Sequence, residues 1–114
     1  MPVERPIRDY EAVKIWETSL RNQWGGDPLG EEPDLIANLE EFCAFVAEDP
    51  DTIIGKLFRI RKADGERVLS AKWRTHYAEK VKEYRVSAGG GTVGQRKGAD
   101  VLSFMIHNGI LIQA

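Results

Sequence analysis

The chain has 114 residues, of which 42% are hydrophobic and 30% are charged, the composition of one folded domain with a modest core. Its formal net charge of -2 at pH 7 argues, taken alone, against a protein that binds nucleic acid. No apolar run approaches the ~20 residues of a membrane helix. Because Cys43 is the only cysteine, no intrachain disulfide can form, and we expect a cytoplasmic location.

The first half of the chain predicts two amphipathic helices. The first covers residues 9–23, with Asp9 as its N-cap and Gly25-Gly26 at its end. Residues 25–33 are rich in Gly, Pro and acidic side chains and predict a loop. The second helix covers residues 34–48. The inward stripes of these two helices are Val13, Trp16, Leu20 and Trp24, and Leu35, Leu39, Phe42 and Val46.

The second half predicts three more helices. Asp51 is expected to cap a short helix that runs through Phe58 and is closed by the turn 63–65; the Asp-Gly pair in that turn could equally join a hairpin, but its flanks do not alternate convincingly. A fourth helix covers residues 70–85. Thr92 and Gln95 have the spacing of a capping box that opens a fifth helix, ending at His107. That helix is expected to bury Val101, Leu102, Met105 and Ile106. The fold class predicted is all-α, a single compact bundle of about five helices.

Charge is distributed unevenly along the chain. Residues 1–54 carry a net charge of -9, residues 55–98 carry +8, and the last 16 residues contribute -1. One basic face is therefore expected, provided that the two segments do not interleave in space. Arg74, Lys82 and Arg85 fall within about 80° of arc on the fourth helix and predict a stripe that contacts phosphates. The alternative is that these side chains cover the edge of the core while their heads stay solvated.

Motifs for catalysis or cofactor binding are not convincing. Residues 89–94 match G-x-G-x-x-G literally, but a helix rather than a strand precedes them, so no nucleotide cofactor is expected. His76 and His107 lack metal-ligand spacing to Cys43, and no serine has the context of a catalytic triad. We expect no cofactor and no metal.

Two segments together resemble one known family. Leu39-x-x-Phe42-x-x-Phe45-Val46 followed by Asp49-Pro50-Asp51 resembles the first helix of the core-binding domain of tyrosine recombinases, or phage integrases. The last helix of that domain is similar to Gly91-Thr92, Arg96-Lys97, Val101-x-x-Phe104-Met105 and Asn108-Gly109-Ile110. The resemblance covers roughly residues 34–112.

This resemblance implies a helical, SAM-like domain that clamps duplex DNA while a separate C-terminal catalytic domain, absent here, cleaves and rejoins strands. The family positions that meet DNA correspond to Thr92, Gln95, Arg96 and Lys97. Arg96 would lie on a polar stripe opposite the buried face, with Asp100, Ser103 and His107. None of Tyr10, Tyr77 and Tyr84 matches the motif of the family's nucleophile, so this chain is not expected to be an enzyme by itself.

The resulting reading divides the chain into residues 1–33, an N-terminal helix and acidic loop, and residues 34–114, the DNA-binding region. The expected partners are double-stranded DNA and other recombinase protomers, with no membrane and no nucleotide. The DNA-binding residues proposed are Arg74, Lys82, Arg85, Thr92, Gln95, Arg96 and Lys97. An alternative is a helical protein–protein interaction domain with an acidic face, because Trp16, Trp24 and Trp73 are many large aromatics for this length.

Overall fold

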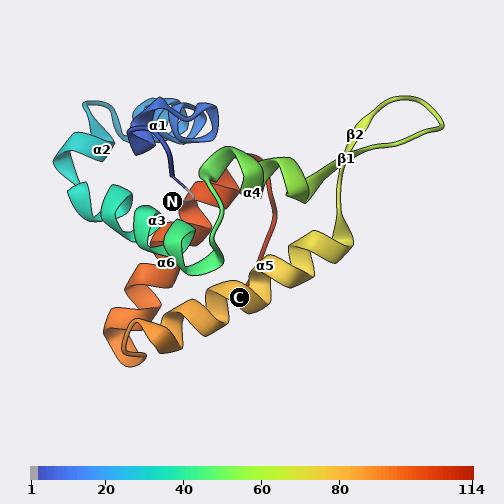
Figure 1. Cartoon of the computed structure of the whole chain (residues 1–114). Helices are drawn as coiled ribbons and strands as arrows, with labels where there is room; N and C mark the ends of the chain where they lie inside the picture. Colours follow the sequence, from blue (N-terminus) through green and yellow to red (C-terminus); the bar gives the residue numbers. More distant parts are fainter. Residues whose placement is uncertain (1–2) are drawn as a thin grey trace.

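In the computed structural model, which describes residues 3–114, helices dominate and one short hairpin interrupts them (Figure 1). The prediction of a single all-α bundle of about five helices is confirmed in part: the described residues form a mostly helical fold of six α-helices, with a two-stranded hairpin in addition. The elements are a 3-10 turn Ile7–Asp9, α1 Glu11–Trp24, α2 Pro28–Glu31, α3 Pro33–Val46, α4 Pro50–Leu57, β1 Phe58–Ile60, β2 Arg67–Leu69, α5 Ala71–Ser87 and α6 Gly91–His107.

Helix α6 lies at the centre of the fold and packs against α1, α3 and α5. Trp16 of α1 meets Phe104 of α6 edge to face, with ring centroids 5.6 Å apart, and its Nε1 donates to Ser103 Oγ at 3.1 Å. Phe42 of α3 packs in the same manner on Tyr84 of α5, at 5.5 Å. The N-terminal helix therefore shares one hydrophobic core with the helices that follow it.

The predicted caps of α1 and α4 are wrong, and the reason is tertiary. Tyr10, not Asp9, precedes the first turn of α1, and it makes no side-chain cap. The carboxylate of Asp51 instead accepts from the backbone N–H of Ala12 at 2.8 Å and of Glu11 at 3.3 Å. Asp49 takes the role predicted for Asp51, because its Oδ1 accepts from the Thr52 N–H at 2.7 Å at the start of α4.

The sequence favours a turn at residues 63–65 that ends a helix, but the structure has the alternative, a hairpin. Strands β1 and β2 are antiparallel, with Phe58 opposite Leu69 and Ile60 opposite Arg67. Gly65 adopts a φ of +71° in the connecting turn. With three residues in each strand, the alternation of apolar and polar residues is too short to indicate a strand. The turn predicted to end a helix therefore went unrecognised as the connection between two strands. The loop predicted over residues 25–33 likewise contains the single-turn helix α2.

Helices α5 and α6 meet at a tight corner of glycines. Gly89, Gly90 and Gly91 all have positive φ, which a side chain would strain. Gly90 is the residue that precedes α6, with no side-chain cap, so the capping box predicted for Thr92 does not form.

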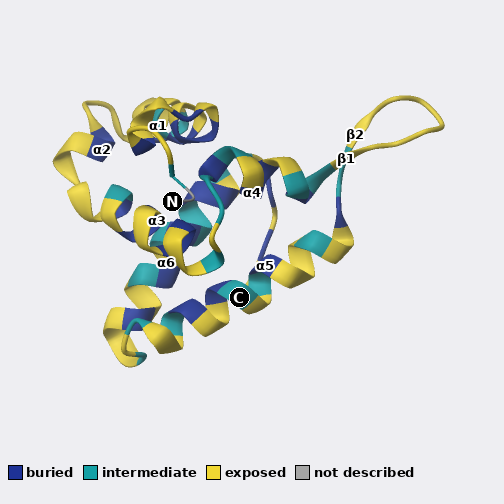
Figure 2. Ribbon diagram, in the orientation of Figure 1, coloured by how far each residue is buried: buried dark blue, intermediate teal, exposed yellow. Residues whose placement is uncertain are grey.

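Two side chains predicted to face inward are exposed instead, although the helices bury their inner faces (Figure 2). Trp24 is 60% exposed and Ile106 is 49% exposed, whereas Phe104 is fully buried; Leu102 is half-buried. After α6, the extended tail buries Ile110 and Ile112 and runs back toward α5 (Figure 1). None of the helices in residues 3–114 has the length and apolarity that crossing a bilayer requires.

Candidate nucleic-acid interface

The basic pair predicted to meet DNA lies beside acidic side chains of α3. Arg96 Nη2 is 3.6 Å from a carboxylate oxygen of Asp34, and Lys97 Nζ lies 3.1 and 3.3 Å from the two oxygens of Glu41. The acidic and basic segments of the sequence therefore interleave where α3 packs on α6. A phosphate that approached these two cations would have to compete with carboxylates already in place.

The polar stripe predicted on the outer face of α6 points instead at its neighbours. Asp100 accepts from Asn38 Nδ2 at 2.7 Å, and His107 Nδ1 is hydrogen-bonded to Ser19 Oγ at 2.6 Å, while Ser103 receives the Trp16 bond described above. Partial burial raises the pKa of Asp100 above its usual value, against the opposing effect of the hydrogen bond from Asn38. This stripe is wrong as a solvent face, because α6 is covered on more than one side.

Arg85 lies apart from the other two members of its predicted stripe. Its Nη1 donates to the backbone oxygen of Ala114, and its half-buried side chain lies against Gly98. Its Nε is buried and has no hydrogen-bond partner among the described residues. Through these contacts, Arg85 links the C-terminal tail to α5 and α6.

Arg74 and Lys82 are both exposed and lie on one wall of a groove of about 740 Å³ between α5 and the C-terminal tail. Lys82 Nζ is 3.3 Å from a carboxylate oxygen of Glu79. Thr92 and Gln95 are exposed at the start of α6. The predicted DNA-binding set is therefore divided between the groove wall, the half-buried Arg85, the exposed start of α6 and the α3–α6 boundary.

Five exposed cations of the basic segment 55–98 have no carboxylate within ion-pair distance in the part of the chain that the structure describes. They are Arg59, Lys62, Arg67, Lys72 and Arg74. All five lie on the hairpin or in the first turn of α5. Residues 59–74 hold six basic and two acidic side chains, so this run has a net charge of +4 in a chain of net -2. A charge count over a shorter window would have found it.

Two of these cations lie against aromatic rings. The guanidinium carbon of Arg67 is 3.6 Å from the centroid of the Phe58 ring, and Lys72 Nζ is 5.4 Å from that of Trp73. A stacked cation keeps its charge and its outward donors, so it can still meet an anion.

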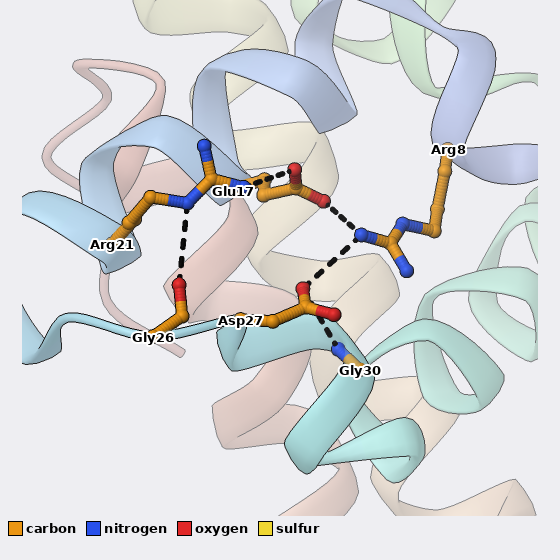
Figure 3. A network of polar contacts seen from close by, with 6 residues as sticks. All are labelled: Arg8, Glu17, Arg21, Gly26, Asp27 and Gly30. Carbon is orange, nitrogen blue, oxygen red and sulfur yellow. Dashed lines mark hydrogen bonds and ion pairs between the residues drawn. The ribbon is translucent and has the colours of Figure 1, made fainter.

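At the N-terminal end, by contrast, arginines are committed to internal contacts (Figure 3). Arg8 Nη2 lies 2.5 Å from Glu17 and 3.2 Å from Asp27, and Arg21 Nη2 lies 2.7 Å from Glu17. The hydrogen bond to Glu17 raises the pKa of Arg8. Asp27 also caps α2 by accepting from the Gly30 N–H at 3.3 Å. This network joins the start of the chain to α1 and α2.

Other reactive groups are few. Within residues 3–114, no three His, Cys, Asp or Glu side chains are grouped as metal ligands. Cys43 is fully buried, and burial raises the pKa of its thiol to about 12, so the thiol stays protonated at neutral pH. Burial also raises the pKa of Tyr84, whose hydroxyl donates to Glu41 at 3.1 Å.

Comparisons with protein-family models, curated proteins and solved structures found no match to this chain.

Proposed function

We propose that this chain binds duplex DNA, as the DNA-binding module of a site-specific tyrosine recombinase or integrase. The observation that carries the proposal is the gathering of five unpaired, exposed cations in the run 59–74, at one end of the molecule. The motif resemblance supplies the kind of module, a SAM-like core-binding domain whose catalytic partner domain performs strand cleavage and joining.

Unpaired cations matter more for DNA than paired ones do. A phosphate that meets a free guanidinium or ammonium displaces condensed counterions without breaking a protein ion pair. Five such contacts would give a slope of about -4.5 in log K against log salt, since each contributes roughly 0.9. Arg96 and Lys97 must first leave Asp34 and Glu41, which makes them secondary contacts that form once the duplex is bound.

In this proposal, Arg74 keeps the role predicted for it, because it is exposed, unpaired and next to the run of free cations. Thr92 and Gln95 are exposed in the first turns of α6, where their side chains can contact a phosphate. Arg85 is assigned to the structure of the domain rather than to DNA. The partners are a DNA duplex and other protomers of the same recombinase.

A salt titration tests the proposal. The parent chain is added to a fluorescent ~30-base-pair duplex, and anisotropy gives Kd between ~20 and 200 mM salt. A variant with Lys72→Gln and Arg74→Gln is expected to lose about two contacts, flattening the slope by roughly 1.8. The matched control carries Lys14→Gln and Lys80→Gln, two exposed or half-exposed lysines elsewhere, and should bind like the parent. A parent chain that leaves the anisotropy unchanged at ~20 mM salt refutes the proposal.

A second candidate is a protein-interaction domain, favoured by the groove along α5. Ile106 and Leu111, which line it, are 49% and 76% exposed. Arg74 and Lys82 line the groove, so its fitting partner would be an acidic amphipathic helix, whereas the alternative drawn from the sequence uses an acidic face. Tight binding of such a helix by a chain that ignores duplex DNA would favour this candidate.

A further inference from the structure

The hairpin projects from the helical body as an arm, defined here as residues 58–69 (Figure 1). Its base is closed where the Ser70 N–H donates to the Leu57 carbonyl at 2.8 Å, next to α4 and α5. Beyond that base, the side chains at the end of the arm are exposed (Figure 2). Ile60, the last residue of β1, is 65% exposed. The end of the arm therefore contributes little to the core, whereas Phe58 and Leu69 at its base pack against it.

Contacts within the arm stabilise the turn at its end. Arg61 donates from Nε and Nη2 to the two oxygens of Asp64, at 3.0 and 2.5 Å, and Asp64 also accepts from the Glu66 N–H at 3.1 Å. These contacts hold the pKa of the Asp64 carboxyl below its usual value, chiefly through Arg61. A second ladder bond, from the Arg61 N–H to the Glu66 carbonyl at 2.8 Å, closes the turn. The arm is thus organised before any partner arrives.

Free positive charge lies on both faces of the arm. Because opposite residues in an antiparallel pair share a face, Ile60 and Arg67 point to one side, and Arg59 and Val68 point to the other. Lys62 lies beyond the ladder, in the turn. A ribbon with a cation on each face and one near its end matches an anionic channel with two charged walls.

Dimensions select which channel. Two strands about 4.8 Å apart, with their side chains, form a ribbon that the ~12 Å major groove of B-DNA admits and the ~6 Å minor groove does not. Arg67 is about three residues from the end of the turn, or roughly 10 Å, and the major groove is ~8.5 Å deep. With the turn at the floor of the groove, Arg59 and Arg67 would stand at the level of the phosphates.

The geometry points to the arm as an element that enters the major groove of duplex DNA. Arg59 and Arg67 contact phosphates on the two walls of the groove, and Lys62 reaches toward the base edges at its floor. This inference rests on the proposed function and adds to it the element, the groove and the contacts.

Shortening the arm tests its geometry without changing its charge. Replacing residues 61–66 by Asn-Gly joins Ile60 directly to Arg67 through a two-residue turn of the kind that hairpins favour. The six residues removed include two basic and two acidic side chains, so the net charge stays at -2. The shortened variant is expected to keep the helical circular dichroism of the parent and to bind the duplex at least tenfold more weakly.

A second variant keeps the arm at full length and changes only its charge, so the test does not depend on the folding of the shortened variant. Arg59→Gln with Arg67→Gln removes the two phosphate contacts and should weaken binding about 60-fold near ~0.1 M salt, since each phosphate contact contributes about eightfold there relative to 1 M salt. The control Lys14→Gln with Lys80→Gln removes the same charge elsewhere and should change Kd less than about threefold. If the arm variant and this control bind equally, the arm makes no contact and the inference is wrong.

Entry of the arm into the major groove of DNA is tested with a duplex whose major groove is filled by glucosylated hydroxymethylcytosine. The parent should bind it at least tenfold more weakly than unmodified DNA, and the shortened variant should not distinguish the two. Equal binding of the parent to both duplexes overturns the inference and leaves DNA binding through α5 intact. Failure of the parent to bind any duplex would overturn the proposed function itself, so the two failures are distinguishable.

Discussion

At the corner between α5 and α6, the structure predicts whether replacing Gly94 by alanine raises or lowers the stability of the fold. A Cβ added at Gly94 would lie 2.4 Å from the backbone oxygen of Arg85 and 3.2 Å from its carbonyl carbon. That same oxygen accepts from the Gly90 N–H at 2.9 Å, a bond that closes the corner. At Gly55, in α4, an added Cβ meets nothing within 4 Å. The two glycines therefore form a matched pair for Gly→Ala.

The two substitutions are expected to change the free energy of unfolding in opposite directions. Alanine improves helix propensity over glycine by up to ~1 kcal/mol, so Gly55→Ala should stabilise by about 0.5–1 kcal/mol near the end of its helix. At Gly94, the overlap is with backbone that cannot rotate away, and overpacking costs about 3 kcal/mol at such a site. The net effect of Gly94→Ala is a loss of about 2 kcal/mol, because propensity offsets part of that cost.

Thermal unfolding followed by circular dichroism measures both. For a domain of 114 residues, 1 kcal/mol corresponds to about 4 °C in Tm. Gly94→Ala should lower Tm by about 8 °C, and Gly55→Ala should raise it by about 2–4 °C. A Gly94→Ala chain as stable as the parent would refute the close approach of α6 to the end of α5.

Two further predictions concern carboxylates. Asp51→Ala should destabilise the fold by about 1–2 kcal/mol, or about 4–8 °C in Tm, because it removes the acceptor for two N–H groups of α1. The control Asp9→Ala should change the stability by less than about 0.5 kcal/mol. Comparable losses in both variants would contradict the capping by Asp51. Because the pKa of Asp100 is raised on folding, its favourable contribution is complete below its unfolded value near 3.8 and is lost as pH rises through the folded value. Asp100→Asn should therefore exceed the parent in urea stability at pH 7 and match it near pH 3, and a difference of equal size at both pH values would count against this account.

Periodicity predicted the long helices well, because each buries one stripe that is visible in the sequence. The positions of Trp16, Leu39, Phe42 and Val101 in the core follow from that rule alone. Helix ends were harder to predict, since the groups that satisfy them need not be neighbours in the chain. Asp51 lies 39 residues from Ala12, the residue whose N–H it accepts from most closely, and no local pattern indicates such a pair.

The polar stripe on α6 failed for a related reason. A period of 3.6 identifies one buried face, but a central helix is covered on several sides, so polar residues there find buried partners rather than water. Asp100, Ser103 and His107 each bond to a side chain from α1 or α3. Sequence periodicity cannot distinguish a solvated polar face from one that is satisfied within the protein.

The charge count shows what a one-dimensional sum omits. The net +8 of residues 55–98 includes cations that neighbouring acids on the same helix neutralise, such as Lys82, and others that α3 neutralises across the fold, such as Lys97. What a phosphate can use is the charge left after these pairs form. That remainder is concentrated on the arm and the first turn of α5, because the arm extends away from the acidic α3. In the proposed function, the residues that bind DNA are therefore those whose cations the folded chain leaves unpaired, and Arg96 and Lys97 of the family-like motif on α6 lie outside that set.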